Sequence, residues 1–173
     1  MANLPGRSEL ARRIETMLID WRVAGESGSS GLSAEANPAA ASPVGASHLP
    51  EPKPPAAYAI GIVDYRRLVE LDEEGMDKAI DEIAWRLDKL VRSGDVLGMI
   101  APDTFLLGTA SMAPSSAGVV MERISGAVAM PLEINGDAVS LRVAIGLAFA
   151  FDGASPEAML SAAERDLQRS LGD

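Results

Sequence analysis

The sequence predicts an α/β sandwich in which a central, mixed and mostly antiparallel sheet is flanked by helices. Helical and strand-like segments follow one another in the order α-β-α-β-β-α-β-α, and interleaving of this kind is typical of layered α/β folds. The chain has 173 residues, of which 47% are apolar, so it is long enough for one domain with a single core. We therefore expect one body rather than two domains.

The first element is expected to be an amphipathic helix over residues 7–22. Its apolar residues Leu10, Ile14, Leu18 and Trp21 are spaced by four, four and three positions. This spacing places them on one face of a helix, which can then pack against the core.

Between residues 24 and 57 the composition changes to Ala, Ser, Gly and Pro, with almost no large apolar side chain. Such a segment buries too little surface to offset its loss of conformational entropy, which predicts a flexible insertion. Pro52-Lys53-Pro54-Pro55 has P-x-x-P spacing, but no arginine flanks it, so a mobile insertion is favoured over a proline-rich docking motif. The chain is thus divided into an N-terminal helix at residues 1–23, this insertion, and a body at residues 58–173.

The body is expected to open with a buried strand at residues 58–63, which form a short apolar run. A long helix at residues 73–91 should follow, because apolar residues recur there at helical spacing and Asp72 can cap its first turn. Residues 96–100 and 105–108 are two further strands, and the short connection between them predicts a hairpin.

The last third of the chain is expected to hold two more helices and one strand. Ser115 or Ser116 can cap a helix that ends near Ala127. Residues 139–149 alternate as a strand does, and Ser-Pro-Glu at the start of residues 155–171 is typical of a helix N-terminus.

The composition excludes several classes of function. A formal net charge of -10 repels phosphate backbones, so nucleic acid is not expected as a partner and any anionic ligand must be held by a local basic cluster. There is no cysteine, and the single His48 sits among prolines, so neither a metal site nor a cofactor is expected. No segment approaches the roughly 18 apolar residues of a membrane span or resembles a signal peptide, which predicts a cytoplasmic protein without membrane association.

Five short segments, each weak alone, match a known family in order and spacing. They are Asn3-Leu4-Pro5-Gly6-Arg7, Ile62-Val63-Asp64-Tyr65-Arg66-Arg67, Ala101-Pro102-Asp103-Thr104-Phe105, Ala144-Ile145-Gly146-Leu147-Ala148 and Ala162-Ala163-Glu164-Arg165-Asp166-Leu167. In this order they resemble the T-G-L-P-N-R, D-x-D-x-F-K, G-G-[DE]-E-F, S-I-G-V-A and A-D-x-A-L-Y segments of the GGDEF domain of diguanylate cyclases. Those enzymes condense two GTP molecules into the bacterial second messenger cyclic di-GMP. The resemblance implies a nucleotidyl-cyclase-like sandwich that acts in signal transduction.

The same resemblance implies that the reaction centre is degenerate. Cyclisation needs metal ions held by carboxylates, but Ile62 stands in the place of the family's first metal-binding Asp, which leaves Asp103 as a lone carboxylate. Ala101 and Pro102 replace the two glycines of the signature, adding side-chain bulk and removing an N–H. Thr104 replaces an acid. We therefore expect no catalytic residue and interpret Asp103 as an ordinary turn residue.

Two further family positions are altered in this sequence. Glu70 stands where the resemblance places a guanine-selecting Asn, and Leu171 where it places a phosphate-contacting Lys. These changes also disfavour catalysis.

One ligand site of the family is retained in the sequence. Arg92-Ser93-Gly94-Asp95 has the residues and spacing of the R-x-x-D motif that binds cyclic di-GMP at an inhibitory site, and Arg123 falls where the family often has a second Arg in this pocket. A carboxylate can accept both the N1–H and the N2–H of guanine, and a guanidinium group can donate to O6 and N7 or stack on the base. The resemblance thus implies a cyclic di-GMP site made by Arg92, Asp95 and Arg123.

A simpler interpretation of these residues also exists. Arg92 near a helix C-terminus interacts favourably with the helix dipole, and Asp95 after Gly94 is an ordinary turn residue. The spacing together with Arg123 favours the binding interpretation.

The leading hypothesis is a catalytically inactive GGDEF-like domain that binds cyclic di-GMP and passes the signal on as a homodimer or to a protein partner. The first alternative is an interaction scaffold that needs no ligand. The second is a residual diguanylate cyclase or GTP-binding regulator that uses Asp103 together with Glu70.

Overall fold

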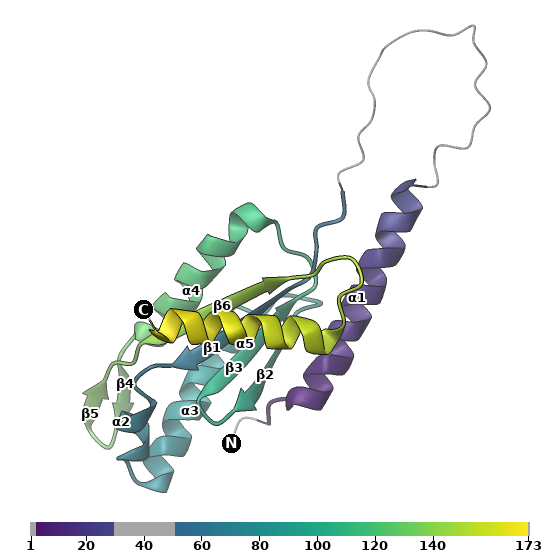
Figure 1. Ribbon diagram of the computed structural model, residues 1–173. Helices are drawn as coiled ribbons and strands as arrows, with labels where there is room; N and C mark the ends of the chain where they lie inside the picture. The colour runs from purple at the N-terminus through teal and green to yellow at the C-terminus, as the bar shows by residue number, and fades with distance from the viewer. Residues whose placement is uncertain (1–2, 30–50, 173) are drawn as a thin grey trace, which may run out of the picture.

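The computed structural model describes residues 3–29 and 51–172 and contains the expected sandwich. Its centre is a four-stranded sheet with strand order β2-β3-β1-β6, and the three neighbouring pairs are antiparallel (Figure 1). The strands are β1 (Ala56–Ile62), β2 (Val96–Ala101), β3 (Thr104–Thr109) and β6 (Val143–Phe149). The predicted fold class is confirmed.

Helices cover both faces of the sheet. Helices α1 (Arg7–Ser29) and α5 (Pro156–Gly172) lie on one face, and α3 (Glu73–Asp88) and α4 (Ala117–Ala129) lie on the other (Figure 1). The smaller elements are α2 (Tyr65–Val69), the 3-10 turn η2 (Pro114–Ser116) and a hairpin of β4 (Leu132–Ile134) and β5 (Asp137–Val139). Within residues 3–29 and 51–172 no helix is both long and apolar enough to span a bilayer.

Strand β1 divides the interior into two cores. Every residue of β1 is buried, and successive side chains of a strand point to opposite faces of its sheet. Tyr58 and Ile60 belong to the core under α3 and α4, whereas Ala57 and Ala59 belong to the core under α1 and α5. On the face of β1 that α5 covers, the side chains are small, and the large side chains point to the other face. This difference explains why α5 can lie close to the sheet.

Gly146 of β6 marks the closest approach of helix and sheet. A Cβ atom at this position would come within 2.1 Å of the Ala163 carbonyl oxygen and within 2.1 Å of the Leu167 backbone nitrogen. Both atoms belong to the backbone of α5, so neither can rotate away. Glycine is therefore required here by close packing between two backbones.

The expected insertion at residues 24–57 is wrong at both of its ends. Helix α1 continues to Ser29, and strand β1 already begins at Ala56. Residues 30–50 lie outside the described residues, so the predicted flexibility of that stretch stays a prediction.

The arm formed by residues 51–55 is also not the free linker that its composition suggested. The carbonyl oxygen of Pro54 accepts a hydrogen bond from the Met112 N–H at 2.9 Å, and that of Pro55 accepts one from the Ala150 N–H at 2.8 Å. Proline lacks an N–H but keeps its carbonyl acceptor, and these acceptors tie the arm to the body.

Two other expectations near the C-terminus need correction. The strand expected at residues 139–149 is β6 alone, from Val143, while Val139 ends the β4–β5 hairpin. The turn of that hairpin is Asn135-Gly136, with φ of 54° and 90°. Asn-Gly is a common signal for such turns, whereas strand alternation alone does not reveal a turn within residues 139–149 or before them. The Ser116 side chain makes no capping hydrogen bond to α4, whereas the expected Asp72 cap of α3 is confirmed, with Asp72 Oδ1 2.8 Å from the Gly75 N–H nitrogen.

We predict that Gly146→Ala lowers the free energy of unfolding by about 1–3 kcal/mol, because the new methyl group forces α5 away from the sheet. Urea unfolding measures the change. Gly126→Ala is the matched control, since a Cβ at that exposed position of α4 has no heavy atom within 4 Å. The control should stabilise the protein by about 0.5–1 kcal/mol through helix propensity. Equal unfolding midpoints for the two variants would contradict the packing argument.

Candidate functional site

The connection between α3 and β2 is a closed turn built from Arg92 to Asp95. The Asp95 N–H donates to the Arg92 carbonyl oxygen at 3.0 Å, and the Arg92 N–H donates to Asp95 Oδ2 at 3.1 Å. Gly94 has a φ of 91°, a conformation that glycine adopts without strain. Local backbone chemistry therefore brings the two ends of the R-x-x-D motif together.

A small pocket contains all three residues that were expected to form the binding site. Arg92 and Asp95 line it from the turn, and Arg123 lines it from α4. We call it the arginine pocket; its volume is about 30 Å³, and its remaining lining residues are Leu90, Leu107, Thr109, Ser111, Met112 and Val120. The structure thus brings together residues that lie up to 31 positions apart in the chain.

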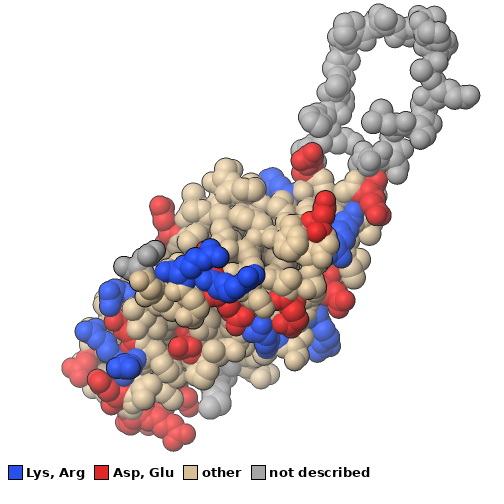
Figure 2. Space-filling model, in the orientation of Figure 1, with Lys and Arg blue, Asp and Glu red and all other residues tan. Residues whose placement is uncertain are grey.

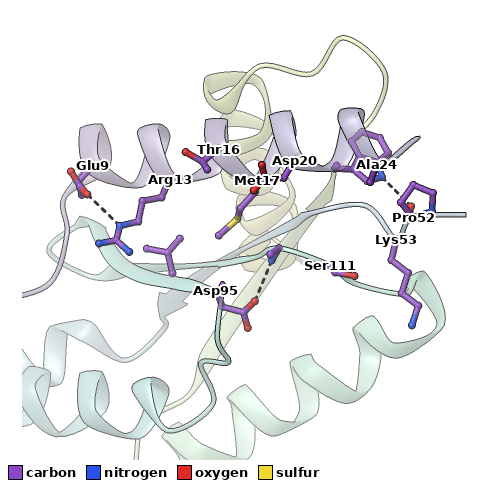
Figure 3. A pocket seen from close by; sticks show the side chains of 14 residues that line it. Glu9, Arg13, Thr16, Met17, Asp20, Ala24, Pro52, Lys53, Asp95 and Ser111 are labelled. Atoms are coloured by element: carbon purple, nitrogen blue, oxygen red, sulfur yellow. Dashed lines mark hydrogen bonds and ion pairs between the residues drawn. The ribbon is translucent and has the colours of Figure 1, made fainter. Parts of the chain in front are cut away.

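The Asp95 carboxylate joins the turn to the end of β3. Its Oδ2 accepts the Arg92 N–H, and its Oδ1 accepts the Ala110 N–H at 3.2 Å. A carboxylate oxygen has two acceptor sites, so each oxygen retains one for a ligand. The carboxylate is half-buried, and Figure 3 shows it pointing away from α1.

The two arginines of the pocket are available cations. Both are exposed, and within the described residues neither forms an ion pair. On the face shown in Figure 2, basic side chains lie in small groups among acidic ones and form no broad basic surface. In a chain of net charge -10, an anion must therefore be held by a local group such as Arg92 with Arg123.

Tyr58 lies under the same region and responds to the Asp95 charge. It is fully buried, pairs with the pocket residue Leu107 across β1 and β3, and its hydroxyl has no hydrogen-bond partner among the described residues. Burial raises the pKa of Tyr58 to about 12, and the negative charge of Asp95 acts in the same direction. Sequence reasoning missed this tyrosine, because a Tyr in an apolar strand shows only that it is buried.

A second and larger cavity borders the arginine pocket. It has a volume of about 750 Å³ and lies between α1, the arm at residues 52–53, and the adjoining ends of β2 and β3 (Figure 3). We call it the α1 groove. Asp95 and Ser111 line both cavities and form the boundary between them.

The carboxylates near the β2–β3 hairpin are held by other groups. Arg142 donates to Asp64 from Nε at 3.1 Å and from Nη2 at 3.0 Å, and its backbone N–H adds a third hydrogen bond at 3.0 Å. These interactions lower the pKa of Asp64, the side-chain hydrogen bond from Arg142 being the largest cause. Asp103 lies in the hairpin turn, as expected, and its Oδ1 accepts a hydrogen bond from the Thr104 hydroxyl at 2.8 Å.

Comparison with known families gives one match. The sequence model described as "Diguanylate cyclase, GGDEF domain" matches residues 73–171. The chain is a member of the GGDEF domain family. No curated protein matches it significantly.

Solved structures of GGDEF proteins share the fold. The GGDEF domain of PA1120 (YfiN or TpbB) from Pseudomonas aeruginosa is 19% identical, with a TM-score of 0.76 over 99% of this chain and 92% of that one. The GGDEF domain of DgcB from Caulobacter crescentus, solved in complex with c-di-GMP, is 14% identical, with a TM-score of 0.73 over 97% and 85%. The P. aeruginosa diguanylate cyclase SiaD, solved with its activator SiaC, is 17% identical, with a TM-score of 0.66 over 96% and 55%.

The carboxylates near the β2–β3 hairpin of this GGDEF domain are not grouped with other metal-ligand side chains in the described part of the chain. Ile62 is buried and its side chain has no ligand atom, and Arg142 donates to both oxygens of Asp64. In the part of the chain that the structure describes, no three His, Cys, Asp or Glu side chains are grouped so that they could hold a metal ion. Arg142 was not anticipated, because it lies 78 positions from Asp64 and no local pattern connects the two.

We predict that Tyr58 ionises only near pH 12. Below pH 10 the phenol is neutral in both the folded and the unfolded chain; between pH 10 and about 12 only the unfolded chain loses the proton. The free energy of unfolding should therefore fall across this interval by at most about 1.4 kcal/mol per pH unit.

Phenolate absorbance and urea unfolding at pH 9 to 12 measure this effect, and Tyr58→Phe should remove the late-ionising phenol. Asp95→Asn should lower the pKa of Tyr58, because it removes the nearby charge. A Tyr58 that ionises near pH 10 in the folded protein would contradict the prediction.

Proposed function

We propose that this GGDEF domain binds cyclic di-GMP through Arg92, Asp95 and Arg123 and does not synthesise it. The observation that carries the proposal is that these three side chains line one pocket, although they come from a turn and from a separate helix. Their chemistry is complementary to a flat, polar and anionic ligand.

Each side chain has a definite role in the proposed complex. The open acceptor sites of the Asp95 carboxylate receive the N1–H and N2–H of one guanine. The guanidinium groups of Arg92 and Arg123 donate to O6 and N7 or to the phosphate, or stack on the base. Exposure of both arginines permits these contacts without breaking an internal ion pair among the described residues.

Loss of synthesis is supported by the state of the carboxylates. Metal-assisted attack of a hydroxyl on a phosphate requires several oxygen ligands around the ions. Asp64 is committed to Arg142, and Asp103 has no second carboxylate grouped with it in the described part of the chain. A domain that keeps the ligand pocket but lacks the metal centre suits a receiver of the signal, which would act through a homodimer or a protein partner.

A ligand-independent interaction scaffold is the second candidate, and one observation favours it. The hydrogen bonds from Asp95 to Arg92 and Ala110 stabilise the turn with or without a nucleotide. This structural role alone would be a sufficient reason for an Asp at this position.

Isothermal calorimetry with cyclic di-GMP distinguishes the two candidates. We expect binding by the unmodified protein and at least about tenfold weaker binding by Arg92→Ala and by Arg123→Ala, since each removes a charge-assisted contact. Arg66→Ala is the matched control, because Arg66 is an exposed arginine on α2, outside the pocket, and its loss should change nothing. Absence of heat, or equal affinities in all four proteins, would leave the scaffold as the function.

A cyclase assay tests the second part of the proposal. Incubation with GTP and Mg²⁺ should give no cyclic di-GMP above a blank without protein. Asp103→Ala should leave that result unchanged, because Asp103 serves the hairpin turn. Product that forms with the unmodified protein and disappears in Asp103→Ala would instead establish a residual cyclase.

A further inference from the structure

Helix α4 is the least charged of the four long helices, although it lies on the outside of the domain (Figure 1). Glu122 and Arg123 are its only charged residues, and of its 13 residues only Ala117, Ile124 and Val128 are buried. A surface helix normally carries charged side chains along the face that it turns to water. The outer face of α4 is therefore a candidate contact surface.

Four exposed residues form a stripe along this outer face. They are Val119, Arg123, Gly126 and Met130, and their spacing of four, three and four positions places them on one side of a helix. Val119 and Met130, at the two ends of the stripe, are 59% and 51% exposed. A Cβ atom at Gly126 would have no heavy atom within 4 Å, so this position is an open notch between larger side chains. We call these four residues the α4 stripe.

The α4 stripe is complementary to itself. Its spacing is the same from either end, so a two-fold axis through its centre lays the stripe antiparallel against a copy of itself. Val119 then faces Met130 of the second copy, and two apolar side chains that are exposed in the single chain cover each other. Arg123 faces Gly126 of the second copy, where the missing side chain leaves room for the long arginine side chain.

The charges of α4 match in the same arrangement. Glu122 lies one helical turn before Gly126, so the arginine over Gly126 of the second copy is within reach of Glu122 there, and symmetry makes two such ion pairs. Within residues 3–29 and 51–172 neither Glu122 nor Arg123 takes part in an ion pair, and adjacent helical residues do not face each other. A guanidinium group has five N–H donors, so this pair leaves Arg123 donors for the arginine pocket.

Other occupants fit the α4 stripe less well. A helix that lies on a membrane surface is rich in Lys and Arg on its polar face, whereas α4 has a single Arg in a chain of net charge -10. An unrelated protein would not require the stripe to be symmetric. The symmetry of size, polarity and charge together favours a second copy of this chain.

We propose that the α4 stripe is the contact between two copies of this chain in an antiparallel, two-fold pair that forms without a nucleotide. The proposal rests on the proposed function only in taking a homodimer as the form that passes the signal on, and it identifies the helix that such a homodimer uses. One pair of helices buries less than the roughly 1,200–2,000 Å² of a standard interface, so the association is weak and depends on protein concentration.

Sedimentation velocity of the full chain without nucleotide tests the pairing. We expect the sedimentation coefficient to rise with protein concentration as monomers form dimers. Glu122→Arg and Arg123→Glu should each weaken the dimer by at least about tenfold, because like charges then meet across the two-fold axis. An equimolar mixture of the two variants should associate about as well as the unmodified protein, since each variant supplies the charge that the other lacks.

Arg165→Glu is the matched control, because Arg165 is exposed on α5, which covers the opposite face of the sheet, and its reversal should leave the dimer unchanged. Val119→Lys alters a second position of the α4 stripe and should also weaken the dimer, so the result does not depend on one ion pair. Urea unfolding verifies that every variant is folded.

A monomer at all concentrations, a dimer that these variants do not weaken, or a mixture that stays monomeric would overturn the proposal. None of these results involves cyclic di-GMP, so each leaves the proposed function standing. A dimer with the expected response to the variants, together with no calorimetric binding of cyclic di-GMP, would overturn the proposed function alone.

Discussion

The pair of backbone hydrogen bonds accepted by Asp95 is the interaction on which the proposed ligand surface depends. One bond closes the turn after α3, and the other fastens that turn to the end of β3. Together they hold Asp95 at the boundary between the arginine pocket and the α1 groove. A carboxylate that accepts two N–H groups is held rigidly, and its remaining acceptor sites are then oriented for a ligand.

The Asp64–Arg142 pair joins two carboxylate oxygens to one guanidinium group at the edge of the sheet. The Arg142 guanidinium group donates a hydrogen bond to each oxygen of the Asp64 carboxylate. Its positive charge balances the negative charge of the carboxylate, so no cation from solution is needed for this purpose. The pair also joins the end of β1 to the start of β6, because the Val63 N–H donates to the Arg142 carbonyl oxygen at 2.9 Å. The position thus has a structural role in this GGDEF domain.

The arm at residues 51–55 illustrates how composition can mislead about order. Proline and glycine content predicts mobility because such segments bury little apolar surface. Here the carbonyl oxygens of Pro52, Pro54 and Pro55 bind donors on α1 and on the loops after β3 and β6. Those donors are distant in sequence, so no property of the arm itself reveals its anchoring.

The sequence by itself determined the elements and the local turn. Apolar periodicity located α1 and α3, residues typical of helix N-termini located α4 and α5, and a short connection located the β2–β3 hairpin. A spacing of three residues was enough to bring Arg92 and Asp95 together. These features depend on backbone geometry within a few residues, which is why they can be read from the chain.

Only the tertiary structure decided which distant residues meet. It placed Arg142 on Asp64 and brought Trp21 and Lys53 to one cavity, and it put Arg123 in the pocket of the turn, as the family resemblance had implied. Contacts of this kind depend on how helices and strands pack over the whole domain, and side-chain periodicity reports only which face of an element is buried. The chemistry of each residue was therefore evident from the sequence, whereas the pairing of residues into sites followed from the packing of the layers.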